Sequence, residues 1–123
     1  MYIYYDSKTG NVERFIKKIQ AKRPDWHFIK INPTMAIKNE GHFLTFTTKI
    51  GEIPATTDEF LQNENNNKLL KSVSSSGNRN WGQFFAIAAD KIQEKYGISV
   101  LMKFELSGTS TEVKNYIDYL ENN

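Results

Sequence analysis

Strand-like and helix-like segments alternate along this chain, and this alternation limits the possible fold more than any other feature of the sequence. Five apolar runs have the length and the aromatic or β-branched content of strands, at 1–5, 26–31, 42–47, 69–76 and 98–106. Apolar residues recur at helical spacing in 12–19, 53–63, 81–97 and 109–120. This order predicts a doubly wound α/β fold, with a mostly parallel sheet covered by helices on both faces.

Local features refine this prediction. The alternating pattern of 26–31 is typical of a strand at an edge of the sheet, and the segment 32–41 is too short and broken for a full crossover helix. The "ENNNK" stretch (64–68) predicts a polar surface loop. One helix is expected over the whole of 81–97, ending at Gly97.

The composition favours a single domain over 1–123, because a chain of this length with 39% hydrophobic residues can close one core. Without cysteine the chain has no disulfides, thiolate metal sites or thiol nucleophiles. No run is long enough to span a bilayer and the start lacks the pattern of a signal peptide, so we expect a cytoplasmic protein without a membrane partner. A net charge of +2 without a basic stripe argues against nucleic acid as a partner.

The sequence indicates no catalytic residue for acid–base chemistry and no metal site. His27 lies in a strand pattern and His42 at the start of a strand, positions that are more often structural or solvated. The carboxylates of "TTDEF" (56–60) fall in the first turn of a helix, where they suit the helix dipole. Any redox activity of the chain therefore needs a cofactor.

Ligands of doubly wound sheets bind beyond the carboxyl ends of the strands, which here means the loops "DSKTGN", "TTKIGEIP" and "SSSGNRNWG". In the first loop, the backbone N–H groups from Thr9 to Val12 are expected to point at one spot, and Gly10 allows a close turn. The side chains of Ser7, Thr9 and Asn11 can complete a nest for a phosphate. A plain capped turn explains the same letters equally well, and neither a Walker loop nor GxGxxG is present.

The other two loops favour a flavin. "TFTTKIG" provides a pair of hydroxyls and a glycine directly after a strand, and "SSSGNRNWG" provides backbone donors together with Trp81, a flat aromatic between two glycines. Flavin mononucleotide (FMN) needs an anion site at one end and polar edges with a stacking partner at the other. The alternative for Trp81 is an aromatic packed in the core, and for Lys49 a solvated loop lysine.

The segments "DSKTGNV", "TTKIGEIPATT", "SSSGNRNWG" and "KFELSGT" stand in the order and spacing of the NrdI proteins, the small flavodoxin-like partners of class Ib ribonucleotide reductase, which the chain resembles over nearly its whole length. The resemblance implies a flavodoxin-like three-layer sandwich, with a five-stranded parallel sheet of order 2-1-3-4-5 and one non-covalent FMN. It further implies that the reduced flavin reacts with dioxygen, and that the resulting oxidant, superoxide, reaches the dimanganese site of the reductase small subunit so that a tyrosyl radical forms. Such a protein is a redox activase acting through bound FMN rather than a turnover enzyme, and its reductant is not identified by the resemblance.

Carried over position by position, the resemblance divides the FMN contacts into three groups. The phosphate is assigned to Ser7, Lys8, Thr9, Gly10, Asn11 and Val12. The isoalloxazine near N5 is assigned to Thr47, Thr48, Lys49, Ile50 and Gly51. The opposite wall and the pyrimidine side are assigned to Ser76, Gly77, Asn78, Trp81 and Gly82. The "FELSGT" segment (104–109) is expected to support that wall or to meet the partner rather than to bind FMN.

Two positions depart from the family pattern. Position 49 is often small in relatives, and Lys49 resists a positive φ more than glycine does. Ile50 stands where an aromatic is expected, so that aliphatic packing replaces stacking on one face of the flavin. Either Lys49 or Arg79 is expected to attract an anionic oxidant such as superoxide.

Two other functions compete with the activase. A general flavodoxin that passes electrons to another reductase shares the site but not the partner. A phosphate-sensing receiver module without flavin needs an acidic cluster after the first strand and an aspartate after the third, where Thr47 and Thr48 stand instead. The sequence therefore gives the receiver little support.

Overall fold

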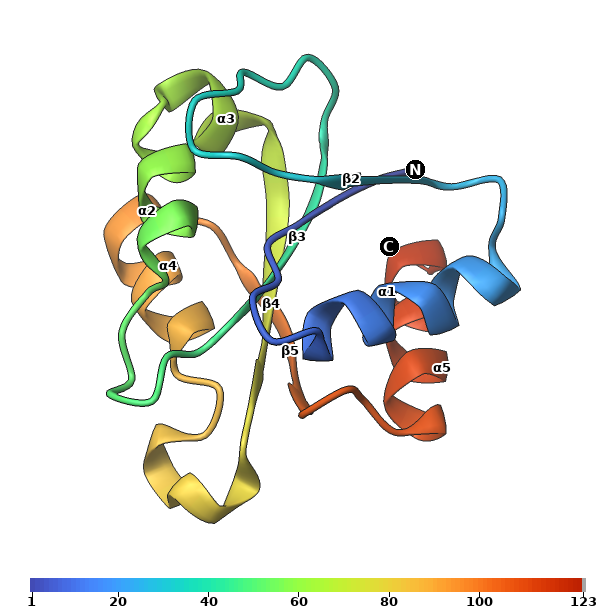
Figure 1. Cartoon of the computed structure of the whole chain (residues 1–123). Coiled ribbons are helices and arrows are strands. Elements are labelled where there is room, and N and C mark those ends of the chain that lie inside the picture. The colour runs from blue at the N-terminus through green and yellow to red at the C-terminus, as the bar shows by residue number, and fades with distance from the viewer. Residues whose placement is uncertain (123) are drawn as a thin grey trace.

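The computed structural model describes residues 1–122, in which five strands alternate with helices (Figure 1). In chain order the elements are β1 (Tyr2–Tyr5), α1 (Asn11–Lys22), β2 (His27–Lys30), β3 (Gly41–Phe46), α2 (Ala55–Gln62), α3 (Glu64–Leu69), β4 (Leu70–Gly77), the 3-10 helix η1 (Arg79–Phe84), α4 (Ala88–Tyr96), β5 (Val100–Glu105) and α5 (Ser110–Glu121). Within this described part of the chain, no helix is both long and apolar enough to cross a membrane.

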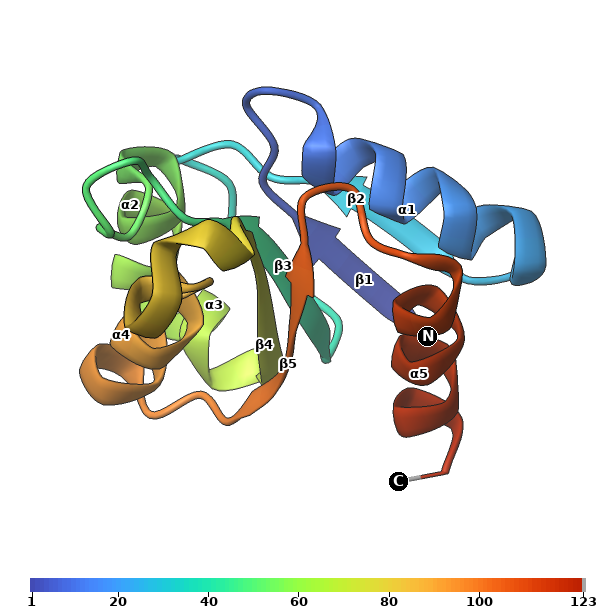
Figure 2. The same ribbon diagram turned by 90° about the horizontal axis from the view of Figure 1, so that it is seen from below.

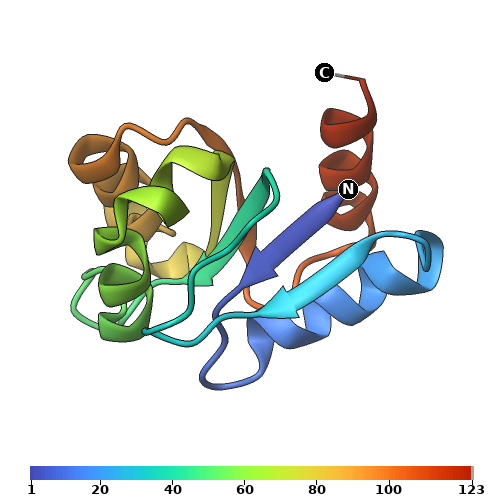
Figure 3. The same cartoon turned by 90° about the horizontal axis from the view of Figure 1, so that it is seen from above.

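The strands form one sheet in the order β2-β1-β3-β4-β5, and every neighbouring pair is parallel. This confirms the predicted flavodoxin-like order and places the second strand at an edge. Helices α1 and α5 cover one face of the sheet, and α2, α3 and α4 cover the other (Figures 1, 2 and 3). Because all strands run in the same direction, the carboxyl ends of β1, β3 and β4 open at one edge of the sheet.

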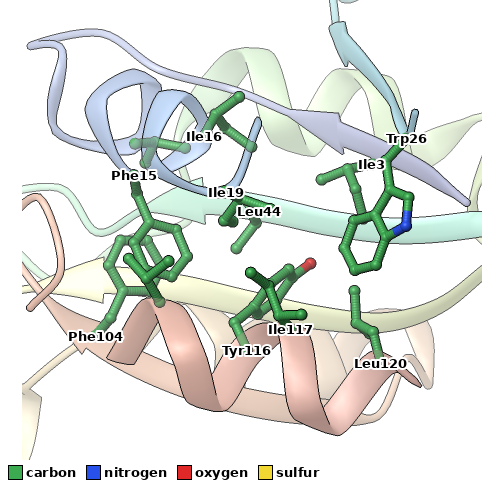
Figure 4. Packing of buried hydrophobic residues seen from close by; sticks show 12 residues of the cluster. Ile3, Phe15, Ile16, Ile19, Trp26, Leu44, Phe104, Tyr116, Ile117 and Leu120 are labelled. Atoms are coloured by element: carbon green, nitrogen blue, oxygen red, sulfur yellow. The ribbon is translucent and has the colours of Figure 1, made fainter. Parts of the chain in front are cut away.

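Aromatic and aliphatic side chains fill the layer between the sheet and the helices α1 and α5 (Figure 4). Phe15 of α1 stacks on Phe104 of β5 with 4.0 Å between ring centroids, and it meets Tyr116 of α5 edge-on at 5.7 Å. Ile3 and Leu44 form the sheet side of this cluster. The close packing fixes the start of α1 relative to the end of β5.

The neighbouring residues in these strands face the opposite layer, as the two-residue period of a strand requires. Tyr4 and Phe43 pack there with Phe60 of α2 and Ile92 of α4. The rings of Phe43 and Phe60 lie 5.6 Å apart. The inner strands are therefore buried on both faces, which explains why they are apolar runs rather than alternating ones.

The prediction of a surface loop at 64–68 is wrong, because these residues belong to the helix α3. Asn63 begins the helix as its cap and accepts a hydrogen bond from the backbone N–H of Asn65 at 2.9 Å. Asn66, in the middle of the polar stretch, is fully buried. A polar helix becomes stable here because its asparagines have partners elsewhere in the chain.

Most of those partners lie in the connection between β2 and β3, which has no helix, as the sequence predicts. The Asn66 amide accepts a hydrogen bond from the N–H of Ile37 at 2.9 Å and donates to the carbonyls of Met35 and Phe60, each at 2.9 Å. Asn65 donates to the carbonyl of Ile37 at 2.7 Å. The asparagines of α3 thus satisfy backbone groups that a crossover helix would otherwise pair internally.

The prediction of one helix over 81–97 is also wrong, because η1 and α4 are separated by a break. Gly82 and Ala86 have φ values of 58° and 51°, both in the left-handed region. The hydroxyl of Ser75 on β4 donates to the carbonyl of Ala86 at 2.6 Å and accepts the N–H of Ala89 at 3.1 Å. Contacts from a neighbouring strand therefore set the start of α4, and the apolar period of the segment does not reveal them.

We predict that Asn66→Asp lowers the free energy of unfolding by about 3 kcal/mol, because it removes two donors to buried carbonyls and buries a carboxylate beside them. Urea denaturation followed by circular dichroism measures the change. The control Asn39→Asp makes the same exchange at an exposed position of the same connection and is expected to cost less than about 0.5 kcal/mol. Equal effects of the two substitutions would show that Asn66 does not hold the connection.

His42 gives the fold a predictable dependence on pH. Its Nδ1 lies 2.7 Å from the hydroxyl of Ser72, and burial, together with the charges of Lys71 and the N-terminus, lowers the pKa of His42 from 6.5 to about 4. The unfolded chain then binds the extra proton first, so stability falls as the pH drops from 6.5 towards 4. Between pH 7 and pH 4.5, the free energy of unfolding of the wild type should fall by about 1 to 2 kcal/mol more than that of His42→Gln. This is about half of what the pKa shift alone gives, because solvent screens a half-buried group, and urea titrations measure it. Parallel pH profiles for the two proteins would contradict this role of His42.

Candidate functional site

A cavity of about 450 Å³ opens at the edge of the sheet where β1, β3 and β4 end. Its lining comes from the three loops that the sequence singles out and from the end of β5. The lining residues are Lys8, Thr9, Asn11, Phe46, Thr47, Thr48, Lys49, Ser76, Gly77, Asn78, Trp81 and Leu106. Ten of these are among the sixteen residues predicted for the site.

The loop between β1 and α1 provides backbone donors. Gly10 has a φ of 95° and precedes the helix without making a side-chain cap. The hydroxyl of Ser7 accepts the N–H of Glu13 at 3.3 Å. Within residues 1–122, the N–H groups of the four residues from Thr9 to Val12 make no hydrogen bond. These donors, at the positive end of the α1 dipole, form a place for an anion.

Two predicted residues of this loop, Gly10 and Val12, can offer only backbone groups to a ligand. The side chain of Val12 is buried in the core under α1, and Gly10 has no side chain. Ser7 borders a second hollow of about 430 Å³, which shares Lys8, Phe46 and Thr48 with the main cavity. The predicted phosphate residues are thus neighbours in space, but only Lys8, Thr9 and Asn11 line the main cavity.

The loop between β3 and α2 begins with a tight turn. The carbonyl of Thr48 accepts the N–H of Gly51 at 2.9 Å, and its hydroxyl accepts the N–H of Glu52 at 2.9 Å. Lys49 and Ile50 occupy the centre of this turn without a positive φ, whereas Gly51 has a φ of 77°. Ile50 is 82% exposed and, with Gly51, borders a smaller hollow beside the main cavity.

The loop between β4 and α4 closes the other side. Trp81 is half-buried, lines both the main cavity and the smaller hollow, and belongs to neither core cluster, so it is not a core aromatic. Gly77 allows close packing, because a Cβ at this position would lie 2.3 Å from the backbone nitrogen of Ala86. Gly82 is exposed in the turn after Trp81 and borders neither hollow.

Among the described residues that border the main cavity and the smaller hollow beside Ile50, sequence reasoning missed three, namely Phe46, Phe84 and Leu106. Leu106 lies in the segment that was expected only to support the wall. It has a φ of 49°, and its N–H donates to the carbonyl of Gly77 at 2.9 Å. Phe46 was detectable as the last apolar residue of the third strand, whereas the turn at Leu106 depends on contacts with another strand.

The charges around the cavity are unevenly balanced. Arg79 contacts Glu105 and Glu112, with 3.1 Å between its Nη2 and Glu112 Oε2, so its charge is compensated. Among the described residues that line the cavity, Lys8 and Lys49 are the charged ones, and both are exposed. The same part of the chain has no cluster of three or more metal-ligating side chains. The cavity suits a ligand with an anionic end and a flat apolar body, which would contact Phe46, Trp81 and Leu106.

A chain of buried hydroxyls ties the start of the β1 loop to α2 and β3. Thr57 of α2 donates to the carboxylate of Asp6 at 2.6 Å, and its hydroxyl lies 2.8 Å from that of Thr45. Burial raises the pKa of Asp6, and the hydrogen bond from Thr57 opposes this effect. Asp6 directly follows β1, so this network fixes the start of the β1 loop against α2.

Comparison with known proteins relates this site to a family. Residues 3–118 match the family described as "NrdI Flavodoxin like". Protein NrdI of Bacillus licheniformis is 41% identical over 119 residues, which cover 97% of this chain and 86% of the relative. The chain belongs to the NrdI flavodoxin-like family. The SPbeta prophage-derived protein NrdI of Bacillus subtilis, another relative in this family, is 39% identical over 117 residues, covering 95% and 88% of the two chains.

A solved structure shows the same fold as this family member. It is a short-chain flavodoxin associated with a non-canonical PDU bacterial microcompartment, and it aligns with a TM-score of 0.64 over 98% of this chain and 93% of that chain. The sequences are 16% identical, so the likeness concerns the fold.

We predict that Thr57→Val destabilises the protein by about 1 to 2 kcal/mol at pH 7, because the buried Asp6 carboxylate loses a donor. Since burial already raises the pKa of Asp6, protonation of its carboxyl at lower pH should recover part of the loss. Urea titrations at pH 7 and pH 5 test both statements. The neighbouring substitution Thr56→Val, which leaves this network intact, should have little effect at either pH, and a pH-independent loss in Thr57→Val would argue against the Asp6 contact.

Proposed function

We propose that this protein binds FMN non-covalently and, when the flavin is reduced, supplies superoxide for assembly of the dimanganese-tyrosyl radical cofactor of a class Ib ribonucleotide reductase small subunit. Family membership supports the link to the reductase. The main support for a flavin is a combination of two features. Four backbone N–H groups make no hydrogen bond within the described residues, and the cavity beside them has aromatic side chains and no carboxylate among its described lining residues. The volume of about 450 Å³ lies within the usual range for cofactor pockets.

The residues present fit the chemistry of FMN at both ends. The phosphate would be held by Ser7, Lys8, Thr9, Gly10, Asn11 and Val12, where backbone donors and the dipole of α1 favour an anion. The edge of the isoalloxazine would meet Thr47, Thr48, Lys49, Ile50 and Gly51. The other wall would be formed by Ser76, Gly77, Asn78 and Trp81, to which Phe46 and Leu106 are added on the basis of the cavity lining, and Gly82 would contribute only the turn after Trp81.

FMN supplies the redox chemistry when it is bound and reduced, because transfer of one electron to dioxygen yields superoxide. The protein then needs no general acid or base of its own, in keeping with a redox activase recharged by a separate reductant. Its own side chains orient the cofactor and leave its edge open to dioxygen and to the partner subunit. Lys49 stands exposed at the cavity and adds a positive charge there, which attracts anions. Arg79 lacks this role because two carboxylates compensate its charge.

The test begins with the purified protein, which should be yellow or become so on addition of FMN. It is reduced with dithionite under anaerobic conditions and then mixed with air and the manganese-loaded class Ib small subunit. Tyrosyl radical is measured by electron paramagnetic resonance. We expect a radical only when the reduced protein is present.

A pair of variants controls this experiment. Thr9→Glu places a carboxylate beside the unpaired N–H groups and should weaken FMN binding at least about tenfold by repulsion of the phosphate. Thr111→Glu adds the same charge at an exposed position in the first turn of α5 and should change FMN binding less than about twofold. At limiting FMN, the radical yield should be low for Thr9→Glu and close to that of the wild type for Thr111→Glu.

The outcomes separate the competing functions. A yellow protein that yields no radical would overturn the activase and favour a general flavodoxin that serves another reductase. A colourless protein that takes up no FMN would overturn both, and the first loop would then be a capped turn.

A further inference from the structure

Within residues 1–122, Arg14 differs from the other arginines in lacking an acidic partner. Arg23 pairs with Glu121 at 2.6 Å, and Arg79 contacts Glu112 at 3.1 Å. In the part of the chain that the structure describes, Arg14 makes no ion pair with a carboxylate. Its charge is therefore available to a ligand.

Two hydrogen bonds hold the Arg14 side chain in one place. Its Nε donates to the hydroxyl of Ser107 at 2.9 Å, and its Nη2 donates to Asn11 Oδ1 at 2.6 Å. The Ser107 hydroxyl in turn donates to the same Asn11 oxygen at 2.9 Å. Lys18 fixes the backbone of this corner, because its Nζ donates to the carbonyls of Ser107 and Gly108 at 3.1 and 2.8 Å. The first turn of α1 is thereby bound to the loop between β5 and α5.

This network determines which group Asn11 can offer to a ligand. Its amide oxygen accepts from both Arg14 and Ser107, whereas its Nδ2 makes no hydrogen bond within residues 1–122. Asn11 lines the main cavity. An amide that presents its nitrogen donates to an anion, whereas the reverse orientation would present an oxygen and repel it. The contacts of Arg14 and Ser107 keep the amide in the donating orientation.

The guanidinium also lies against the turn that begins the helix. A Cβ built on Gly10 would be 2.8 Å from Arg14 Nη1, so this nitrogen lies close to the glycine and occupies the space that a side chain would need. Nη1 makes no hydrogen bond in the described part of the chain. A fixed positive charge thus stands next to the unpaired N–H groups of the loop, where it adds to the dipole of α1.

We propose that Arg14 and Ser107 are positioning residues for the phosphate of FMN: they hold Asn11 as a donor and keep an uncompensated positive charge at the anion loop. This inference rests on the proposed binding of FMN. It predicts that Arg14 and Ser107 strengthen binding of the phosphate group and do not change binding of the flavin ring. A merely structural role would weaken flavins with and without phosphate alike.

The test compares the dissociation constants of FMN and riboflavin for the apoprotein, measured by flavin fluorescence at low and at moderate salt. Arg14→Met should weaken FMN about tenfold, because it removes a charge and two donors, and riboflavin should change less than about twofold. Ser107→Ala leaves the charge of Arg14 in place. It should weaken FMN binding less than Arg14→Met does and should leave riboflavin binding unchanged. The affinity for FMN should depend less on salt in Arg14→Met than in the wild type.

Two variants serve as controls. Lys22→Met removes the same charge from the last turn of α1, where the side chain is exposed, and should leave both affinities within about twofold. Arg14→Lys retains the charge but cannot contact Ser107 and Asn11 at the same time as the guanidinium does. Its affinity for FMN should lie between those of Arg14→Met and the wild type. Urea denaturation of each variant checks that the fold is unchanged.

The possible results are distinct. A wild type that binds neither flavin would overturn the proposed FMN site together with this inference. Wild-type binding of FMN with an unaltered affinity in Arg14→Met would overturn the inference alone. Equal weakening of FMN and riboflavin would also overturn it, since the residues would then support the site without acting on the phosphate.

Discussion

The parallel pairing of β1, β3 and β4 is the constraint on which the cavity depends. Tyr5 lies opposite Leu44, and Phe46 lies opposite Ser76, so the three strands end close together. The pairing continues one residue beyond β1, because the N–H of Asp6 donates to the carbonyl of Leu44 at 2.9 Å. The pairing of the strands therefore holds the loops that follow them at one edge of the sheet, independently of contacts between the loops.

Buried hydroxyls then fix the loops to the sheet and to the helices that follow them. Thr47 accepts the N–H of Ala88 at 3.2 Å, and Ser75 holds the same region through Ala86 and Ala89. Serine and threonine are unusual in the buried centre of a sheet, since an unpaired hydroxyl there is costly. Here the hydroxyls of Thr47 and Ser75 bond to backbone groups at and just before the start of α4, so they replace caps that the local sequence lacks.

The sequence allows the parallel sheet, its helix layers and the three cavity loops to be predicted, because apolar periodicity is a property of whole segments, and its resemblance to the NrdI family implies the strand order. It does not allow prediction of structure that depends on distant partners. The helix at 64–69 looks like a loop because its asparagines bond to the connection before β3. The break before α4 is hidden in an apolar period because Ser75 on β4 causes it. Both errors have one physical origin, since a polar side chain can satisfy the backbone of a remote segment.

The same reasoning applies to the site. The loop positions of Thr9, Asn11 and Trp81 follow from the order of strands and helices, so these residues could be named from the sequence. Leu106 could not, because its place on the wall depends on a left-handed turn and on the carbonyl of Gly77. Arg14 could not either, because its pattern position on α1 is that of an ordinary surface residue and its partner Ser107 lies 93 residues away in the chain.

Uncompensated positive charge is distributed unevenly around the cavity. With 16 basic and 14 acidic residues the overall field is weak, so local pairing decides where positive charge remains. At the β4 loop, Arg79 is compensated by Glu105 and Glu112. At the β1 loop, the dipole of α1, the backbone N–H groups from Thr9 to Val12 and Arg14, which has no carboxylate partner among the described residues, act together. Most of the donors for an anion lie at the β1 end of the cavity, and Phe46, Trp81 and Leu106 line its apolar part beside polar residues of the β3 and β4 loops. An elongated ligand with one anionic end is therefore favoured with that end at the β1 loop.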